Sequence, residues 1–196
     1  MLPKAINSLV GTLDVVYKDR IPGYRATLDF EQGQIVITKR HPTGEINSLM
    51  HELVHLAFLL AWGCVGHEID EREEPACSYL GRFLPKVLKD NPMMLQKPLP
   101  EINVLCEIWS VVECEYPDDN DDDIAFKADV RKQQYRIGKN TSNDNKILRI
   151  FTLTCESILE ACRVRDVEDD YYLAMYSMLF AILKANPEVV KMCGDN

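Results

Sequence analysis

An apolar stripe between positions 46 and 61 constrains the fold of this chain more than any other feature. Apolar residues recur there at a period near 3.6, which is typical of an amphipathic helix with one face in a core. Thr43 and Glu45 supply start signals, and Gly63 follows the last apolar position. The sequence therefore predicts a long helix from about Pro42, whose apolar stripe consists of Ile46, Leu49, Met50, Leu53, Ala57, Leu60 and Ala61.

The polar side of this helix carries the segment His51-Glu52-Leu53-Val54-His55. His51 and His55 are four residues apart, so they lie one turn apart on one face and can bind the same metal ion. Neutral imidazole is a good zinc ligand, and a catalytic zinc site leaves one position to water. Glu52 lies about 100° around the helix from His51, where its carboxylate reaches such a water rather than the metal. The pattern predicts a zinc site on His51 and His55, with Glu52 as a general base.

The third ligand has several candidates. Zinc accepts carboxylate oxygen readily, and two acidic residues open a second predicted helix that can pack against the first. A histidine lies beyond the glycines that end the first helix, and a cysteine there suits a structural site better than a hydrolytic one. The candidates are Glu73, Glu74, His67, Asp70 and Cys64.

The remaining chain divides at a proline-rich stretch from 91 to 100, which is typical of a linker or a long surface connection. Before it, β-rich runs indicate strands at 13–17, 24–30 and 34–38, with a hairpin around Gly33. A second helix begins near Glu73 or Glu74, because Pro75 is tolerated only in a first turn. After the proline-rich stretch, we expect helices over about 101–115, 124–135, 146–163 and 168–186, and no internal repeat. The aromatics of the last helix, Tyr171, Tyr172, Tyr176 and Phe180, fit packing better than a binding stripe.

The composition excludes several function classes. A net charge of −9 without a Lys/Arg cluster disfavours nucleic acid as a partner. No apolar run is long enough to span a membrane, and the N-terminus lacks the apolar core of a signal peptide. The seven cysteines match neither a disulfide framework nor paired zinc knuckles, so we expect reduced thiols in a cytoplasmic protein.

Three segments together resemble a known family. They are the strand Ile35 to Ile37, the segment from Ile46 to His55, and the stretch from Glu73 to Leu80. Their order is similar to that of the small gluzincin-type metallopeptidase domains of bacteriophage and prophage proteins, distant relatives of the ImmA/IrrE group. The resemblance covers roughly residues 5 to 90. It implies zinc on His51, His55 and a glutamate, with Glu52 as the base, and its alignment favours Glu74. An SprT-like arrangement with His67 as third ligand fits less well, because the expected basic region is missing.

These observations predict an α+β fold: a short antiparallel sheet or hairpin and a zincin-type helix pair in 1–92, followed by a mostly helical extension in 101–196. The expected function is zinc-dependent hydrolysis of a peptide bond in a protein or peptide substrate. The strand at 34–38 can hold an extended substrate at its edge. The alternative is a catalytically silent zinc-binding interaction protein that grips a partner, for example a host protein if the gene is viral. A purely structural zinc site is disfavoured, because no fourth protein ligand is evident.

Overall fold

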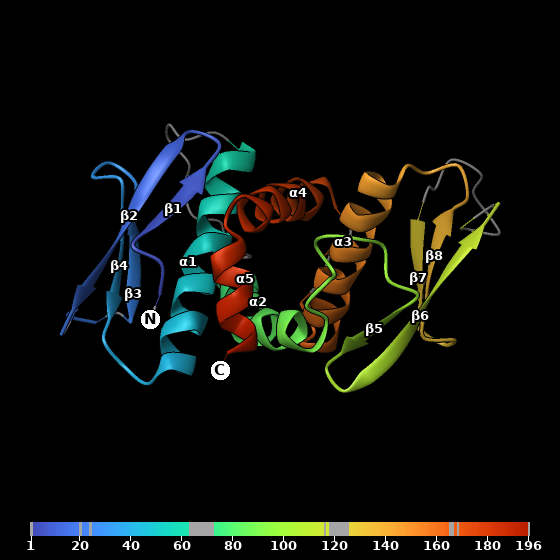
Figure 1. Cartoon of the computed structure of the whole chain (residues 1–196), viewed down its shortest axis with the longest axis horizontal. Helices are drawn as coiled ribbons and strands as arrows, with labels where there is room; N and C mark the ends of the chain where they lie inside the picture. Colours follow the sequence, from blue (N-terminus) through green and yellow to red (C-terminus); the bar gives the residue numbers. More distant parts are fainter. Residues whose placement is uncertain are drawn as a thin grey trace.

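Two four-stranded sheets lie at opposite ends of the molecule, and the helices lie between them (Figure 1). The computed structural model describes residues 2–19, 21–23, 25–62, 73–115, 117, 126–164, 167 and 169–195. The predicted α+β class is confirmed, but the predicted antiparallel sheet is wrong, because each sheet contains one parallel pair of strands.

The first sheet has the strand order β1-β2-β4-β3. Strands β2 and β4 pair in parallel, and the other two pairs are antiparallel. The predicted strands at 13–17, 24–30 and 34–38 are confirmed, as is the hairpin, in which Gly33 adopts a left-handed φ of +64°. The elements of this half are β1 (Ala5–Ser8), β2 (Gly11–Lys18), β3 (Ala26–Asp29), β4 (Gln34–Thr38), α1 (Pro42–Trp62) and α2 (Glu73–Asp90).

The second half begins with strands, so the predicted helices at 101–115 and 124–135 are wrong, and this half is not mostly helical. Apolar residues at 102, 105, 109 and 112 fit a helical spacing, and the hairpin turn at Leu105 and Cys106 contains no Gly, Asn or Pro to mark it. The two closing helices are confirmed. The elements are β5 (Glu101–Val104), β6 (Glu107–Cys114), β7 (Phe126–Asp129), β8 (Gln134–Gly138), α3 (Asn143–Ala161), α4 (Asp170–Ala185) and α5 (Pro187–Gly194).

The two halves repeat one topology, which corrects the prediction that the chain has no internal repeat. The second sheet has the order β5-β6-β8-β7, with the same parallel and antiparallel pairs as the first. The turns also correspond: the Asp29 carboxylate accepts from the backbone N–H of Gln32, and the Asp129 carboxylate accepts from that of Lys132. We call 5–91 the first repeat and 101–186 the second repeat.

The repeats are joined reciprocally at the ends of their second helices. Asn91, after α2, exchanges two hydrogen bonds with the backbone of Asn103 in β5. Asn186, after α4, exchanges the same two bonds with the backbone of Asn7 in β1. Each Asn also donates to a carbonyl of its own helix. Each first strand is therefore held by the second helix of the other repeat.

One continuous core runs through both repeats. Helix α1 packs against α2 and α4, and α3 packs against the same two helices. Met94 and Leu95 are buried, so the proline-rich connection is part of the core rather than a surface linker alone. The packing prediction for the last helices is confirmed for Tyr172, Tyr176 and Phe180, which are buried.

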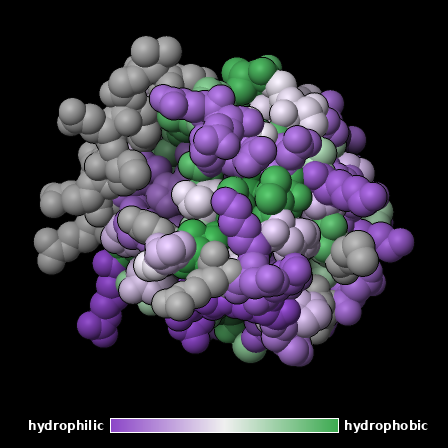
Figure 2. Space-filling view, turned by 90° about the vertical axis from the view of Figure 1, so that its left-hand side faces the viewer, coloured by the Kyte–Doolittle hydropathy of each residue, from purple (hydrophilic) through white to green (hydrophobic). Residues whose placement is uncertain are grey.

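The surface at the first-sheet end is mixed, with hydrophilic side chains around several small apolar patches (Figure 2). No single described helix is long and apolar enough to cross a membrane; α4 and α5 meet the length and composition requirement only as a pair, with an 86° bend between them.

Candidate metal centre

The HELVH segment lies in the middle of α1, with its two histidines turned towards α2 and its apolar residues in the core. Leu53 and Ala57 are fully buried, as the helical geometry predicts. His51 and His55 lie one turn apart, and their Nε2 atoms are 3.1 Å from each other. The helix therefore directs both imidazoles at one point.

Glu74, at the start of α2, completes a cluster of three possible ligands. One carboxylate oxygen lies 3.6 Å from Nε2 of His51, and the other lies 3.3 Å from Nε2 of His55. The Glu74 side chain is 60% exposed, whereas the two histidines are 25% and 15% exposed. The cluster is thus buried behind the histidines and open to solvent beside Glu74.

Glu73 has a different position, behind His55. Its carboxylate lies 2.6 Å from Nδ1 of His55, and its side chain is 2% exposed. A carboxylate that accepts from one ring nitrogen fixes the tautomer and leaves the other nitrogen's lone pair to face a metal. Glu73 also forms a second close set with His55 and the buried Cys77. This set would use the same imidazole through its other nitrogen, and the thiol of Cys77 has a strongly raised pKa through burial, which disfavours a thiolate ligand.

Close contact between α1 and α2 brings Glu74 to the histidines. A Cβ on Gly81 would lie 2.9 Å from Cβ of His51 and 3.0 Å from its Cα and N. Real side chains do not tolerate such a contact with backbone, so only glycine permits this spacing. Gly81 is the residue that sets the distance between the two ligand-bearing helices.

Glu52 lies on the other side of the histidines, against the first sheet. It is 5% exposed and hydrogen-bonds to the backbone of Leu28 in β3, the edge strand of that sheet. Burial raises its pKa to about 7; the charges of His55 and the bond to Leu28 act in the opposite direction. Glu52 is not one of the three clustered ligand residues, which fits a base better than a ligand.

The two imidazoles titrate differently. Burial lowers the pKa of His51, and the neighbouring His55 lowers it further. Burial also acts to lower the pKa of His55, but its hydrogen bond to Glu73 and the surrounding carboxylates outweigh this and raise it. The pKa of His55 therefore lies above that of His51.

The donor set fits a zinc ion. A tetrahedral ion with ordinary zinc–nitrogen and zinc–oxygen lengths separates its ligand atoms by about 3.3 to 3.5 Å. The two Nε2 atoms are 3.1 Å apart, one Glu74 oxygen lies 3.6 Å from Nε2 of His51, and the other lies 3.3 Å from Nε2 of His55, so the three side chains lie close to this spacing. Two imidazoles and one carboxylate are also a donor set that zinc accepts in hydrolytic sites. His67, Asp70 and Cys64, the other candidates for third ligand, lie outside the described residues.

Among its described residues, the second repeat lacks this donor set. The buried positions Ile46, Leu49 and Met50 of α1 match Ile147, Ile150 and Phe151 of α3. In this register, the counterparts of His51, Glu52 and His55 are Thr152, Leu153 and Glu156. The fold of the second repeat is therefore kept without a matching cluster.

Comparisons of the chain with protein-family models, with curated proteins and with solved structures found no match.

Reasoning from the sequence missed two residues that shape the site. Gly81 carried a readable signal, because a glycine inside a predicted amphipathic helix suggests a close approach of backbone. Leu28 carried none, because its role depends on β3 being the edge strand.

Proposed function

We propose that the protein is a zinc-dependent metallopeptidase in which His51, His55 and Glu74 hold the metal and Glu52 is the general base. The observation that carries the proposal is the convergence of both Nε2 atoms and the Glu74 carboxylate at zinc-ligand separations, with a separate buried carboxylate beside them. We also propose that the first repeat has a zincin-type fold.

In this proposal Glu73 and Glu52 have different roles. Glu73 accepts a hydrogen bond from Nδ1 of His55 and so presents Nε2 to the metal. A bound zinc ion would supply Lewis acidity and would lower the pKa of a water towards neutrality. Glu52, whose pKa of about 7 suits proton exchange at neutral pH, accepts the proton and delivers it to the leaving amine.

An extended substrate would bind along β3. The strand at 34–38, predicted to offer its edge, is β4, and it is interior because it pairs with both β2 and β3. Strand β3 is the edge strand, and its Leu28 is bonded to Glu52. A peptide added to β3 would therefore place its backbone next to the base.

The decisive experiment is Glu52→Gln. Glutamine keeps the size of the side chain but cannot accept a proton, so zinc content should remain at about one ion per chain while hydrolysis falls by about two to four orders of magnitude. Zinc is measured by elemental analysis, and hydrolysis by mass spectrometry of a defined peptide library incubated with each protein. His51→Ala is the control that should lose both. Zinc bound to Glu52→Gln with undiminished cleavage would contradict the proposed base.

A second candidate function is a zinc-binding interaction protein without hydrolysis. The observation that favours it is the second repeat, in which the same fold persists without the donor set. In this case Glu52→Gln leaves every biological effect of the protein intact.

A further inference from the structure

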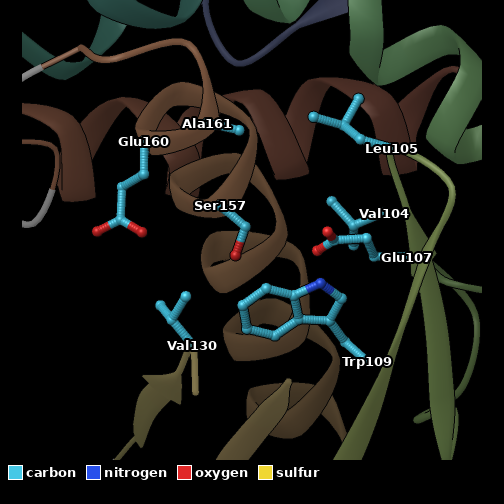
Figure 3. A pocket seen from close by; sticks show the side chains of 8 residues that line it. All are labelled: Val104, Leu105, Glu107, Trp109, Val130, Ser157, Glu160 and Ala161. Atoms are coloured by element: carbon cyan, nitrogen blue, oxygen red, sulfur yellow. The ribbon is translucent and has the colours of Figure 1, made fainter. Parts of the chain in front are cut away.

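The second repeat contains a cavity of about 310 Å³ between the β5–β6 hairpin and the last turns of α3 (Figure 3). Its walls are apolar at the hairpin, where Val104 and Trp109 are buried. Two carboxylates line the cavity: in this view the Glu107 carboxylate lies above the Trp109 ring, and the Glu160 carboxylate lies further away, at the upper left. None of the described residues that line it is basic.

Divergence between the repeats explains why the cavity exists. In the register of α1 and α3, Ser157 and Ala161 of the cavity stand where the first repeat has Leu56 and Leu60. Both leucines pack into the core of the first repeat. Replacing two leucines by serine and alanine removes the side chains that would fill this space.

A position next to the second sheet also has a smaller side chain than its counterpart in the first repeat. After the β7 and β3 strands, Val130 of the cavity stands where the first repeat has Phe30, which packs against the core. Val130 itself is exposed. Three positions around this point are thus smaller than their counterparts in the first repeat.

The floor of the cavity is held rigidly. The rings of Trp109 and Tyr135 pack with centroids 4.9 Å apart, and the Tyr135 hydroxyl donates to Oγ of Ser157 at 3.0 Å. At the rim, Leu105 and Cys106 adopt left-handed φ values of +52° and +74°, which are strained for residues other than glycine.

We propose that this cavity binds an arginine or lysine side chain of a protein partner. Its volume is at the lower end for ligand pockets and suits one long side chain rather than a larger ligand. The apolar wall accommodates the methylene stem, and the indole of Trp109 attracts a cation. Glu107 supplies opposite charge for the cationic head, and the planar guanidinium of arginine can bond both oxygens of its carboxylate. This site lies in the other repeat from His51 and does not depend on a metal.

Binding in this cavity can be followed by the fluorescence of Trp109. It has two tryptophans, so Trp62→Phe leaves Trp109 as the only indole. We expect titration of this variant with the peptide acetyl-Gly-Arg-Gly-amide to change Trp109 fluorescence saturably. The same peptide with citrulline, which is neutral and nearly the same shape, should bind at least tenfold more weakly. Absence of a saturable change, or equal binding of the citrulline peptide, overturns the proposal.

Two variants made in the Trp62→Phe protein locate the binding. Ala161→Leu restores the first-repeat residue at the cavity wall, and Glu107→Gln removes one charge; each should weaken arginine-peptide binding at least fivefold. Their matched controls are Ala185→Leu at the exposed end of α4 and Glu188→Gln on α5, which should leave binding unchanged. Circular dichroism verifies that all four variants are folded. Undiminished binding by both Ala161→Leu and Glu107→Gln would place the peptide elsewhere and refute the site.

Discussion

At the scale of single residues, the two adjacent glutamates at the start of α2 have separate roles in the proposed centre. Glu74 faces the Nε2 atoms of both histidines, whereas Glu73 is buried against Nδ1 of His55. A ligand and a residue that orients a ligand differ in how much metal affinity they supply.

Glu74→Gln should therefore weaken zinc binding more than Glu73→Gln does. Loss of an orienting carboxylate costs about 10–100-fold in metal affinity, and loss of a ligand should exceed this. Competition with a chromophoric chelator measures both affinities. The reverse order would make Glu73 the ligand and remove Glu74 from the proposed site.

The raised pKa of Glu52 implies that its buried carboxylate lowers the free energy of unfolding of the protein without zinc. Below about pH 4.5 the carboxyl is protonated in both the folded and unfolded states, so burial carries no charge penalty. As pH rises to about 7 the unfolded state ionises first, and the folded state loses relative stability over this window. Above pH 7 the full penalty is present.

Glu52→Gln should consequently stabilise the chelator-treated protein at pH 8, by about 3 kcal/mol for a shift of this size. At pH 4 the variant and the parent should unfold at the same denaturant concentration. Urea unfolding at the two pH values measures the difference, and a stabilisation that is equal at both would show that charge burial is not its cause.

At the scale of elements, the spacing of α1 and α2 determines whether the proposed ligands meet. Glycine inside a helix normally lowers stability by about 1 kcal/mol relative to alanine, so its presence at position 81 needs a compensating contact. The contact is the backbone of His51, which leaves no room for a Cβ.

Gly81→Ala should destabilise the protein by about 1–3 kcal/mol, because overpacking outweighs the gain in helix propensity. It should also weaken zinc binding, since α2 carries Glu74. Gly44→Ala in α1 is the matched control: a Cβ there meets only the Arg40 side chain, at 3.7 Å, so stability should be unchanged or raised. Thermal unfolding and chelator competition report both effects, and a neutral Gly81→Ala would show that the helices adjust without cost.

At the scale of the whole molecule, the two repeats depend on each other. Asn186 from the second repeat holds β1 of the first, and Asn91 from the first holds β5 of the second. Helix α1 also packs against α4. Separation of the repeats would expose apolar residues and leave buried polar groups without partners.

We expect a chain of residues 1–92 to lack cooperative unfolding when produced alone, and likewise a chain of residues 93–196. Mixed or co-expressed, the two should associate and recover a cooperative transition and zinc binding. Calorimetry and size-exclusion chromatography test this. Cooperative unfolding of 1–92 alone would instead establish it as an independent domain.

The sequence by itself determined the local elements with strong periodicity and the histidine pair. The stripe from Ile46 to Ala61 predicted α1, and the i, i+4 spacing of His51 and His55 placed both rings on one face, because helical geometry alone relates such positions. Three of the four strands of the first sheet were also predicted, but not β1, and Gly33 marks the turn between β3 and β4.

Tertiary structure decided what local patterns cannot encode. The strands of the second repeat were hidden because the turn before Gln134 has Gln133 in the left-handed region where the first repeat has Gly33. The edge position of β3 and the approach of α2 at Gly81 arise from contacts between distant segments. The exchange of Asn91 and Asn186 between repeats is likewise a non-local arrangement, because a hydrogen bond across 179 residues leaves no periodic trace in the chain.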